Sequence, residues 1–224
     1  MDHSPLVTIV SLVWGDYDRF IPDWLAHLDR LPGNPNAIIV HGPDIDPGKY
    51  RKPNVTWVAA DPFDTGETGF RLCDQVYPLV TEGWIWPLAI DDYGTHEGMQ
   101  LLLDAPADAE FMTITATYLD GSGRWDSDLN QILGPMSGYR MVDGCPFTAA
   151  LYKRAGPVSN PPEWQGTFGW GWYLRVMAAG ANVFNGTGPV SVLCTKDTGW
   201  GRRATDTSNQ ERLAHEYARH LGLM

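Results

Sequence analysis

The residues of this sequence best suited to chemistry are two adjacent aspartates, Asp91 and Asp92. They directly follow the apolar segment 84–90 (WIWPLAI), which is typical of a buried strand although Pro87 weakens its regularity. Neighbouring carboxylates repel each other unless a cation or hydrogen-bond donors lie close, and a hard divalent ion meets that need while also binding phosphate oxygens. An Asp pair after a strand is also common as a solvated turn or helix cap, so the surrounding elements decide between the two interpretations.

The first half of the chain alternates strand and helix patterns. Segment 6–13 (LVTIVSLV) is a nearly continuous apolar run rich in β-branched residues, typical of a strand that is buried on both faces. Pro78 is expected to end or kink a helix within 71–80. The remaining elements predicted here are a helix at 21–31 and strands at 37–40, 55–59 and 84–90.

The second half carries clear helix signals. Thr95 is a candidate N-cap for a helix through Leu103, Gly180 is expected to end a helix over 171–179, and Ser208 with Glu211 forms a capping box for a last helix. The Gly-, Asp- and Ser-rich segment 121–138 is predicted to be a loop over a site. Strands are predicted at 110–118, 147–152, 182–184 and 190–193.

Alternation of strands and helices predicts one α/β domain with a doubly wound, mainly parallel sheet, whose ligand lies beyond the carboxyl ends of the strands. At 224 residues with 43% apolar content, the chain is long and apolar enough for one such core. No apolar run approaches the ~20 residues of a membrane helix, and no signal peptide is visible, so we expect a cytoplasmic protein without a membrane span.

Charge and cysteine content exclude several functions. The net charge of −11 argues against sequence-independent binding to a nucleic-acid backbone, which depends on clustered Lys and Arg. The three cysteines lie far apart without the spacing of a zinc site, so we expect them to be reduced and structural.

Five segments, in order along the chain, resemble glycosyltransferase family 2 and its GT-A relatives. They are VTIVSLVWGDYDRF, AIIVHGPD, TEGWIWPLAIDDYG, MVDGCPFTAALYKRAGPV and WYLRVMAAGANVF. The resemblance implies a Rossmann-like GT-A domain over 1–224, with a nucleotide-sugar-binding half (1–94) and an acceptor-binding half with a C-terminal helix (95–224). It also implies a DxD-like acidic turn that binds Mn2+ or Mg2+ and a nucleoside-diphosphate sugar as cosubstrate.

The resemblance places a donor site at Asp91 and Asp92, which would bind both metal and donor. Val13, Trp14 and Gly15 would meet the nucleotide where the first strand ends: the indole offers a stacking face and the glycine allows close approach. A core tryptophan beside an ordinary turn is the alternative.

Basic residues complete the expected donor site. Arg71 corresponds to a residue near the diphosphate in the family, with a surface salt bridge as its alternative. Arg202 and Arg203 are expected on a mobile loop that orders over the diphosphate, with a surface turn as the alternative. Lys196 would neutralise phosphate directly in a rival account without metal.

The acceptor side is less well defined by the resemblance. The stretch TFGWGWYLR is similar to the WGWG segment of β-1,4-galactosyltransferases, so Trp170 and Trp172 are expected to form the acceptor wall, with core packing as the alternative. The acidic pair that carries the family's catalytic base before this helix is absent from the sequence 168–171. Asp143 and Glu163 are the remaining candidates for the base that deprotonates the acceptor.

These observations favour transfer of a sugar from a nucleoside-diphosphate sugar to a saccharide, a protein or a modified nucleic-acid base, nucleic acid entering only as acceptor. A catalytically inactive GT-A-derived protein that binds carbohydrate or nucleotide is the alternative, because the usual base is missing. A nucleotidyltransferase would show a Gly-rich, basic loop after the first strand, and LVWGDYDRF has none.

Overall fold

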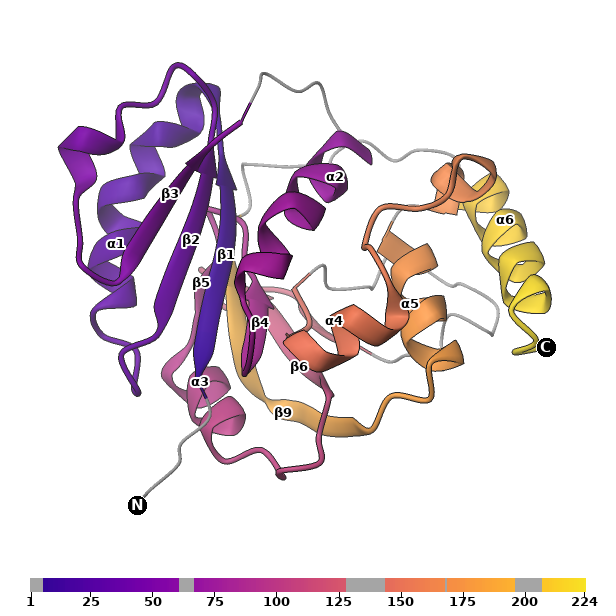
Figure 1. Cartoon of the computed structure of the whole chain (residues 1–224). Helices are drawn as coiled ribbons and strands as arrows, with labels where there is room; N and C mark the ends of the chain where they lie inside the picture. Colours follow the sequence, from indigo (N-terminus) through magenta and orange to yellow (C-terminus); the bar gives the residue numbers. More distant parts are fainter. Residues whose placement is uncertain (1–5, 61–66, 128–143, 168, 196–206) are drawn as a thin grey trace.

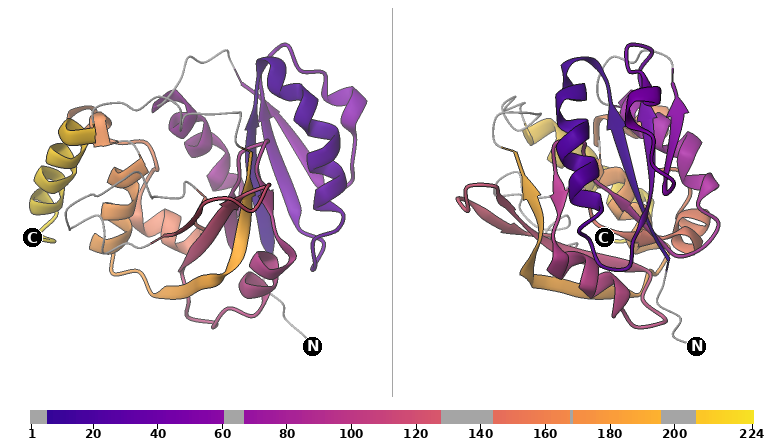
Figure 2. Two further views of the ribbon diagram at one scale, coloured as in Figure 1. Left: turned by 180° about the vertical axis from the view of Figure 1, so that it is seen from behind. Right: turned by 90° about the vertical axis from the view of Figure 1, so that its left-hand side faces the viewer.

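A mixed β-sheet with helices on both faces forms the centre of the molecule (Figures 1 and 2). The computed structural model describes residues 6–60, 67–127, 144–167, 169–195 and 207–224. The sheet order in this part of the chain is β3-β2-β1-β4-β8-β6-β9-β5, with β7 paired to β6. The strands are β1 (Val7–Val13), β2 (Asn36–His41), β3 (Val55–Ala59), β4 (Trp84–Pro87), β5 (Tyr93–Gly94), β6 (Phe111–Tyr118), β7 (Arg124–Asp126), β8 (Phe147–Thr148) and β9 (Val183–Cys194).

The first four strands are mutually parallel, as their apolar composition predicts. In β1 every residue except Leu12 is buried, because helices cover both faces of this part of the sheet. Ile9 pairs with Ala37 of β2 on one side and Trp86 of β4 on the other. The expectation of a largely parallel α/β sheet is confirmed for this half.

The strand order reverses between β1 and β4. The chain adds β2 and β3 on one side of β1 and then returns to place β4 on the other side. In doubly wound sheets the connections diverge at such a point, leaving a crevice beyond the carboxyl ends where ligands bind. Trp14 follows β1 at this point, and Asp91 lies shortly after β4.

The other half of the sheet is mixed. Strand β8 is antiparallel to both β4 and β6, β9 is parallel to β6, and β5 is antiparallel to β9. The predicted strand pair at 182–184 and 190–193 is wrong: these residues belong to one strand, β9. The pairing of β9 with β6 shifts register between Thr113 and Thr115 and again between Thr115 and Ala116, which accommodates the glycines in the middle of β9.

Several helices begin or end close to where the sequence predicts, although α1 ends at Leu28 rather than residue 31 and α2 begins at Glu67, before the expected segment. Thr95 caps α3, its Oγ1 accepting a hydrogen bond from the Gly98 N–H at 2.9 Å. Helix α2 ends at Val76, and the short 3-10 helix η3 (Tyr77–Leu79) takes up Pro78. The helices are α1 (Ile21–Leu28), α2 (Glu67–Val76), α3 (His96–Leu103), α4 (Ala149–Ala155), α5 (Gly169–Ala178) and α6 (Thr207–His220).

Three local predictions need correction. The strand predicted at 147–152 covers only Phe147–Thr148, because Thr148 caps helix α4 by accepting from the Leu151 N–H at 3.2 Å. The strand predicted at 84–90 ends at Pro87. Within the predicted loop 121–138, residues 124–126 form β7, and the part from residue 128 lies outside the described residues.

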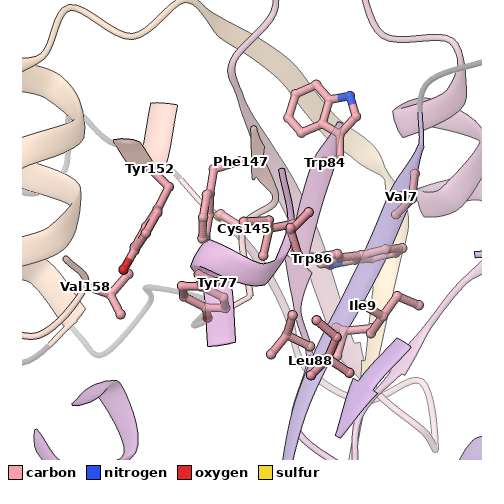
Figure 3. Close-up of a cluster of buried hydrophobic side chains, with 14 of the residues drawn as sticks. Val7, Ile9, Tyr77, Trp84, Trp86, Leu88, Cys145, Phe147, Tyr152 and Val158 are labelled. Carbon is pink, nitrogen blue, oxygen red and sulfur yellow. The ribbon is translucent and has the colours of Figure 1, made fainter. Parts of the chain in front are cut away.

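Aromatic side chains join the two halves of the core. Tyr77 meets Phe147 edge to face with ring centroids 5.4 Å apart, and Trp86 is completely buried beside Ile9 (Figure 3). Such ring contacts add to the free energy gained from burying apolar area. Elements from the first and second halves of the chain therefore share one core.

Helix α5 contains a glycine that its surroundings require. A Cβ at Gly171 would overlap Asn160 Oδ1 and lie 2.5 Å from Thr167 Oγ1. Asn160 is itself fixed because its Oδ1 accepts from Arg175 at 2.8 Å. The second glycine of the Gly-Trp-Gly-Trp sequence is thus explained by packing.

Candidate donor site at the ends of β1 and β4

The acidic turn lies against the end of β9. The Asp92 N–H donates to the Ala89 carbonyl at 3.0 Å, and the Thr195 hydroxyl donates to the Asp91 carbonyl at 2.6 Å. Strand β5 follows at once and pairs Tyr93 with Leu193. Asp91 is 8% exposed and Asp92 is half-buried, so the turn is a fixed part of the fold rather than a solvated loop.

Carboxylates dominate the electrostatics of this turn. Burial, Asp92 and Asp91 raise the pKa of the Cys194 thiol. Burial followed by Asp91 and Asp16 raises the pKa of the Tyr17 phenol, which Arg19 opposes. Among the described residues whose charge acts on Tyr17 and Cys194, Arg19 is the one cation, and it is paired with Asp16 at 2.9 Å.

The same two carboxylates act on a further tyrosine. Burial, with Asp23, Asp91 and Asp92 following, raises the pKa of Tyr93. The described carboxylates therefore create a negative local potential near the switch point between β1 and β4. A diphosphate would be repelled there unless a cation accompanied it.

The turn after β1 forms the other wall. Gly15 adopts φ +56°, a left-handed conformation that glycine adopts without strain, and a Cβ there would touch no described atom within 4 Å. The rings of Trp14 and Tyr17 stack with centroids 5.8 Å apart. The Val13 side chain is completely buried, so this residue offers the site only its backbone, and its carbonyl accepts from the Gly42 N–H at 3.0 Å.

Arg71 lies on α2, which begins at the edge where β1, β2 and β3 end (Figure 1). Its side chain is exposed and makes no ion pair with any described residue. Its role at the diphosphate stays a prediction.

The candidate acceptor-side residues differ in exposure: the two tryptophans are buried, whereas Glu163 is exposed. Trp170 and Trp172 are 8% and 5% exposed, and Trp172 packs against Phe147 with centroids 5.3 Å apart. Burial weighs against the acceptor-wall role of both tryptophans, which stays a prediction. Glu163 is exposed in the 3-10 helix η5 (Pro162–Thr167), which packs on α6.

The remaining predicted site residues, Asp143, Lys196, Arg202 and Arg203, lie outside the described residues. The structure therefore brings together Trp14, Gly15, Asp91 and Asp92, together with residues that the sequence analysis did not select. These are Tyr17, Asp44, Cys194 and Thr195.

The fold is similar to solved glycosyltransferase structures. Residues 1–349 of S. aureus TarS, in complex with UDP-GlcNAc, match at TM-score 0.67 and 15% identity, covering 97% of this chain and 66% of that one. The chain has the fold of GT-A glycosyltransferases. The mannosyltransferase PcManGT from Pyrobaculum calidifontis, in complex with GDP-Man and Mn2+, matches at TM-score 0.53 and 10% identity, covering 93% of this chain and 61% of that one.

The GT-A similarity is one of structure. A longer TarS structure matches at TM-score 0.62 over 85% of this chain but 37% of its own, so this chain spans no more than about two thirds of the proteins that it resembles. No family model and no curated protein matches the sequence. None of the described helices is long and apolar enough to cross a membrane.

Proposed function

We propose that this protein transfers a sugar from a nucleoside-diphosphate sugar to a saccharide, a protein or a modified nucleic-acid base. The observation that carries the proposal is the position of Asp91 and Asp92: a fixed acidic turn at the switch point of a GT-A sheet, beside the turn after β1. Glycosyl transfer needs stabilisation of the departing diphosphate, and these acidic groups lie close enough to the expected nucleotide wall to act on Tyr17.

The residues present fit a divalent cation that binds together with the donor. Asp91 and Asp92 supply hard oxygen ligands, whereas no group of three His, Cys, Asp or Glu able to hold a metal occurs in the described part of the chain. Mn2+ or Mg2+ would supply positive charge for the leaving diphosphate when bound. The remaining ligands would then come from the diphosphate itself, and affinity for the metal alone would be weak.

The protein's own residues would orient the donor around this turn. Trp14 would stack on the base, and Gly15 keeps the turn after β1 open beside it. Arg71 would approach the diphosphate from α2. Arg202 and Arg203 would cover it, and Lys196 would provide the phosphate's partner if no metal takes part.

Proton transfer from the acceptor hydroxyl needs a carboxylate. Residues 168–171, which precede or open α5, include no titratable group. We propose Glu163 or Asp143 as the base, since these carboxylates lie in the acceptor half.

The missing acidic pair also supports a second candidate, a protein that binds a nucleotide or carbohydrate without turning it over. A turnover assay separates the two. Purified protein is incubated with UDP- and GDP-sugars and a mixture of saccharide, protein and nucleic-acid acceptors, and release of UDP or GDP is measured. We expect acceptor-dependent release in wild type and a loss of at least about 100-fold in Asp92→Asn, as for loss of an electrostatic stabiliser of the transition state.

Asp108→Asn is the matched control, since Asp108 is exposed and lies outside the site. Binding of UDP or GDP without release of either from any sugar would favour the binding protein. Equal release in wild type and Asp92→Asn would reject the proposed site.

A further inference from the structure

The carboxylate of Asp44 reaches across the end of β1. Its Oδ2 accepts a hydrogen bond from the Gly15 N–H at 2.8 Å, although the two residues are 29 positions apart. The neighbouring Gly42 N–H donates to the Val13 carbonyl at 3.0 Å. The turn that begins at Trp14 is thus tied twice to the segment that follows β2.

Gly42 is a glycine because Asp44 occupies the space of a side chain. A Cβ at Gly42 would lie 2.6 Å from Asp44 Oδ1 and 3.6 Å from the Trp14 Cβ. The φ of Gly42 lies outside the left-handed region, so an alanine there is compatible with the backbone. The segment is held in turn by the Ile45 N–H, which donates to the Gly42 carbonyl at 3.2 Å, and by burial of the Ile45 side chain.

This bond decides what the turn after β1 can offer a ligand. The Gly15 N–H is already used, so it is not available to a phosphate oxygen. The bond instead fixes a glycine in the left-handed conformation, and with it the backbone that carries the Trp14 indole. A mobile turn would have to be ordered when a nucleotide binds, at a cost in affinity.

We propose that Asp44 is a positioning residue for the nucleoside part of the donor. It acts through Gly15 by holding the turn of Trp14 ready for stacking, and it makes this contribution as a hydrogen-bond acceptor rather than as a charge. The inference rests on the proposed function for its ligand, whereas the bond itself is tested without one.

Three substitutions separate a role of Asp44 as hydrogen-bond acceptor from a role as negative charge. Asp44→Ala removes the acceptor. Asp44→Asn keeps a carbonyl oxygen at the same position and removes the charge. Gly42→Ala leaves Asp44 intact but displaces its carboxylate, and the displaced atom is the end of a flexible side chain, so we expect the fold to tolerate it.

Asp46→Ala is the matched control. Asp46 is an exposed carboxylate of the same segment that accepts a backbone bond, from the Gly48 N–H at 2.9 Å, without reaching β1. Two measurements are made on each variant: hydrogen exchange at the Gly15 amide, and the Kd of UDP and of GDP with Mn2+ by calorimetry.

We expect Asp44→Ala and Gly42→Ala to speed exchange at Gly15 and to raise the Kd about 3- to 10-fold, the range for one hydrogen bond. For Asp44→Asn and Asp46→Ala, the Kd should remain within about 2-fold of the wild-type value. Unchanged Kd in Asp44→Ala with faster exchange would overturn the positioning role. A Kd in Asp44→Asn as high as in Asp44→Ala would show that charge is what matters, and would overturn it too.

Failure of the nucleotide binding that the proposed function requires gives a different result. Wild type would then bind neither UDP nor GDP, which removes the ligand and rejects the positioning role with it. Exchange at Gly15 would still respond to Asp44→Ala in that case, because the hydrogen bond belongs to the fold.

Discussion

The hydroxyl of Thr195 donates a hydrogen bond to the backbone carbonyl of Asp91 at 2.6 Å. These residues are 104 positions apart, and the bond fastens the acidic turn after β4 to the end of β9. Because β9 lies between β6 and β5 in the sheet, the acidic turn is held by a strand from the second half of the chain.

Removing this bond should loosen the acidic turn. Thr195→Val keeps the shape of the side chain and removes the hydroxyl that donates the hydrogen bond. We therefore expect the free energy of unfolding to fall by about 1 kcal/mol and the Kd of UDP with Mn2+ to rise several-fold. Urea unfolding and calorimetry measure the two effects. Thr195→Ser keeps the hydroxyl and should behave as wild type, and equal weakening in both variants would show that the methyl group rather than the bond matters.

The Arg154–Glu110 pair predicts a pH-dependent contribution to stability. Arg154 donates to both carboxylate oxygens at 2.6 Å, and these hydrogen bonds lower the pKa of Glu110 below its ordinary value of 4.5. The unfolded chain therefore takes up this proton first as pH falls, so the stabilisation is present above about pH 4.5 and is lost below it.

Glu110→Gln should destabilise the protein by about 0.5–1 kcal/mol at pH 7, because both partners are partly exposed. The difference from wild type should shrink as unfolding is repeated at pH values falling through 4.5. Glu82→Gln is the control, because Glu82 is exposed and forms no ion pair with any residue that the structure describes. A difference that is independent of pH would contradict the assignment to this ion pair.

Gly171 should not tolerate a side chain. Alanine would collide with the side chains of Asn160 and Thr167, and we expect a loss of about 1–3 kcal/mol from overpacking. Gly69→Ala is the contrasting change: its Cβ would lie 3.7 Å from Leu12 Cδ1, an ordinary contact, and alanine favours helix α2 by up to about 1 kcal/mol. Thermal unfolding of both variants checks this, and equal Tm values would be evidence against the packing account.

Replacement of the acceptor base should lower turnover and spare donor binding. A general base contributes about 100- to 10,000-fold, so Glu163→Gln or Asp143→Asn should reduce kcat on that scale while the Kd of UDP stays unchanged. Steady-state kinetics and calorimetry on the same preparations measure both. Near-normal kcat in both variants would exclude these residues as the base.

The sequence predicted the elements that carry the donor site because their signals are local. The apolar run of β1, the Thr95 cap of α3 and the aspartates after β4 each follow from neighbouring residues. The end of β4 was placed three residues too late, since Leu88, Ala89 and Ile90 are apolar whether they form a strand or a buried turn. Apolar composition alone does not distinguish these two.

Contacts between distant segments could not be predicted in this way. Asp44 reaches Gly15, and Thr195 reaches Asp91, only because the sheet order brings their strands together. The Gly-Pro-Asp sequence after β2 indicates a tight turn, but it does not indicate that Asp44 bonds to Gly15. Trp172 is a different case: a motif suggests a binding surface, and its indole packs against Phe147 and Tyr152, so the acceptor-wall role stays a prediction.

We propose that Asp91 and Asp92 bind a nucleoside diphosphate through a shared divalent cation, and calorimetric titration of UDP and GDP is the decisive experiment. Wild type and Asp91→Asn are each titrated with Mn2+, with Mg2+ and with chelator. We expect binding in wild type with Mn2+ that falls by at least about 10-fold in chelator and in Asp91→Asn, since the carboxylates meet the diphosphate only through the ion. Affinity that is unchanged by chelator and by Asp91→Asn, and is lost in Lys196→Ala, would contradict the account.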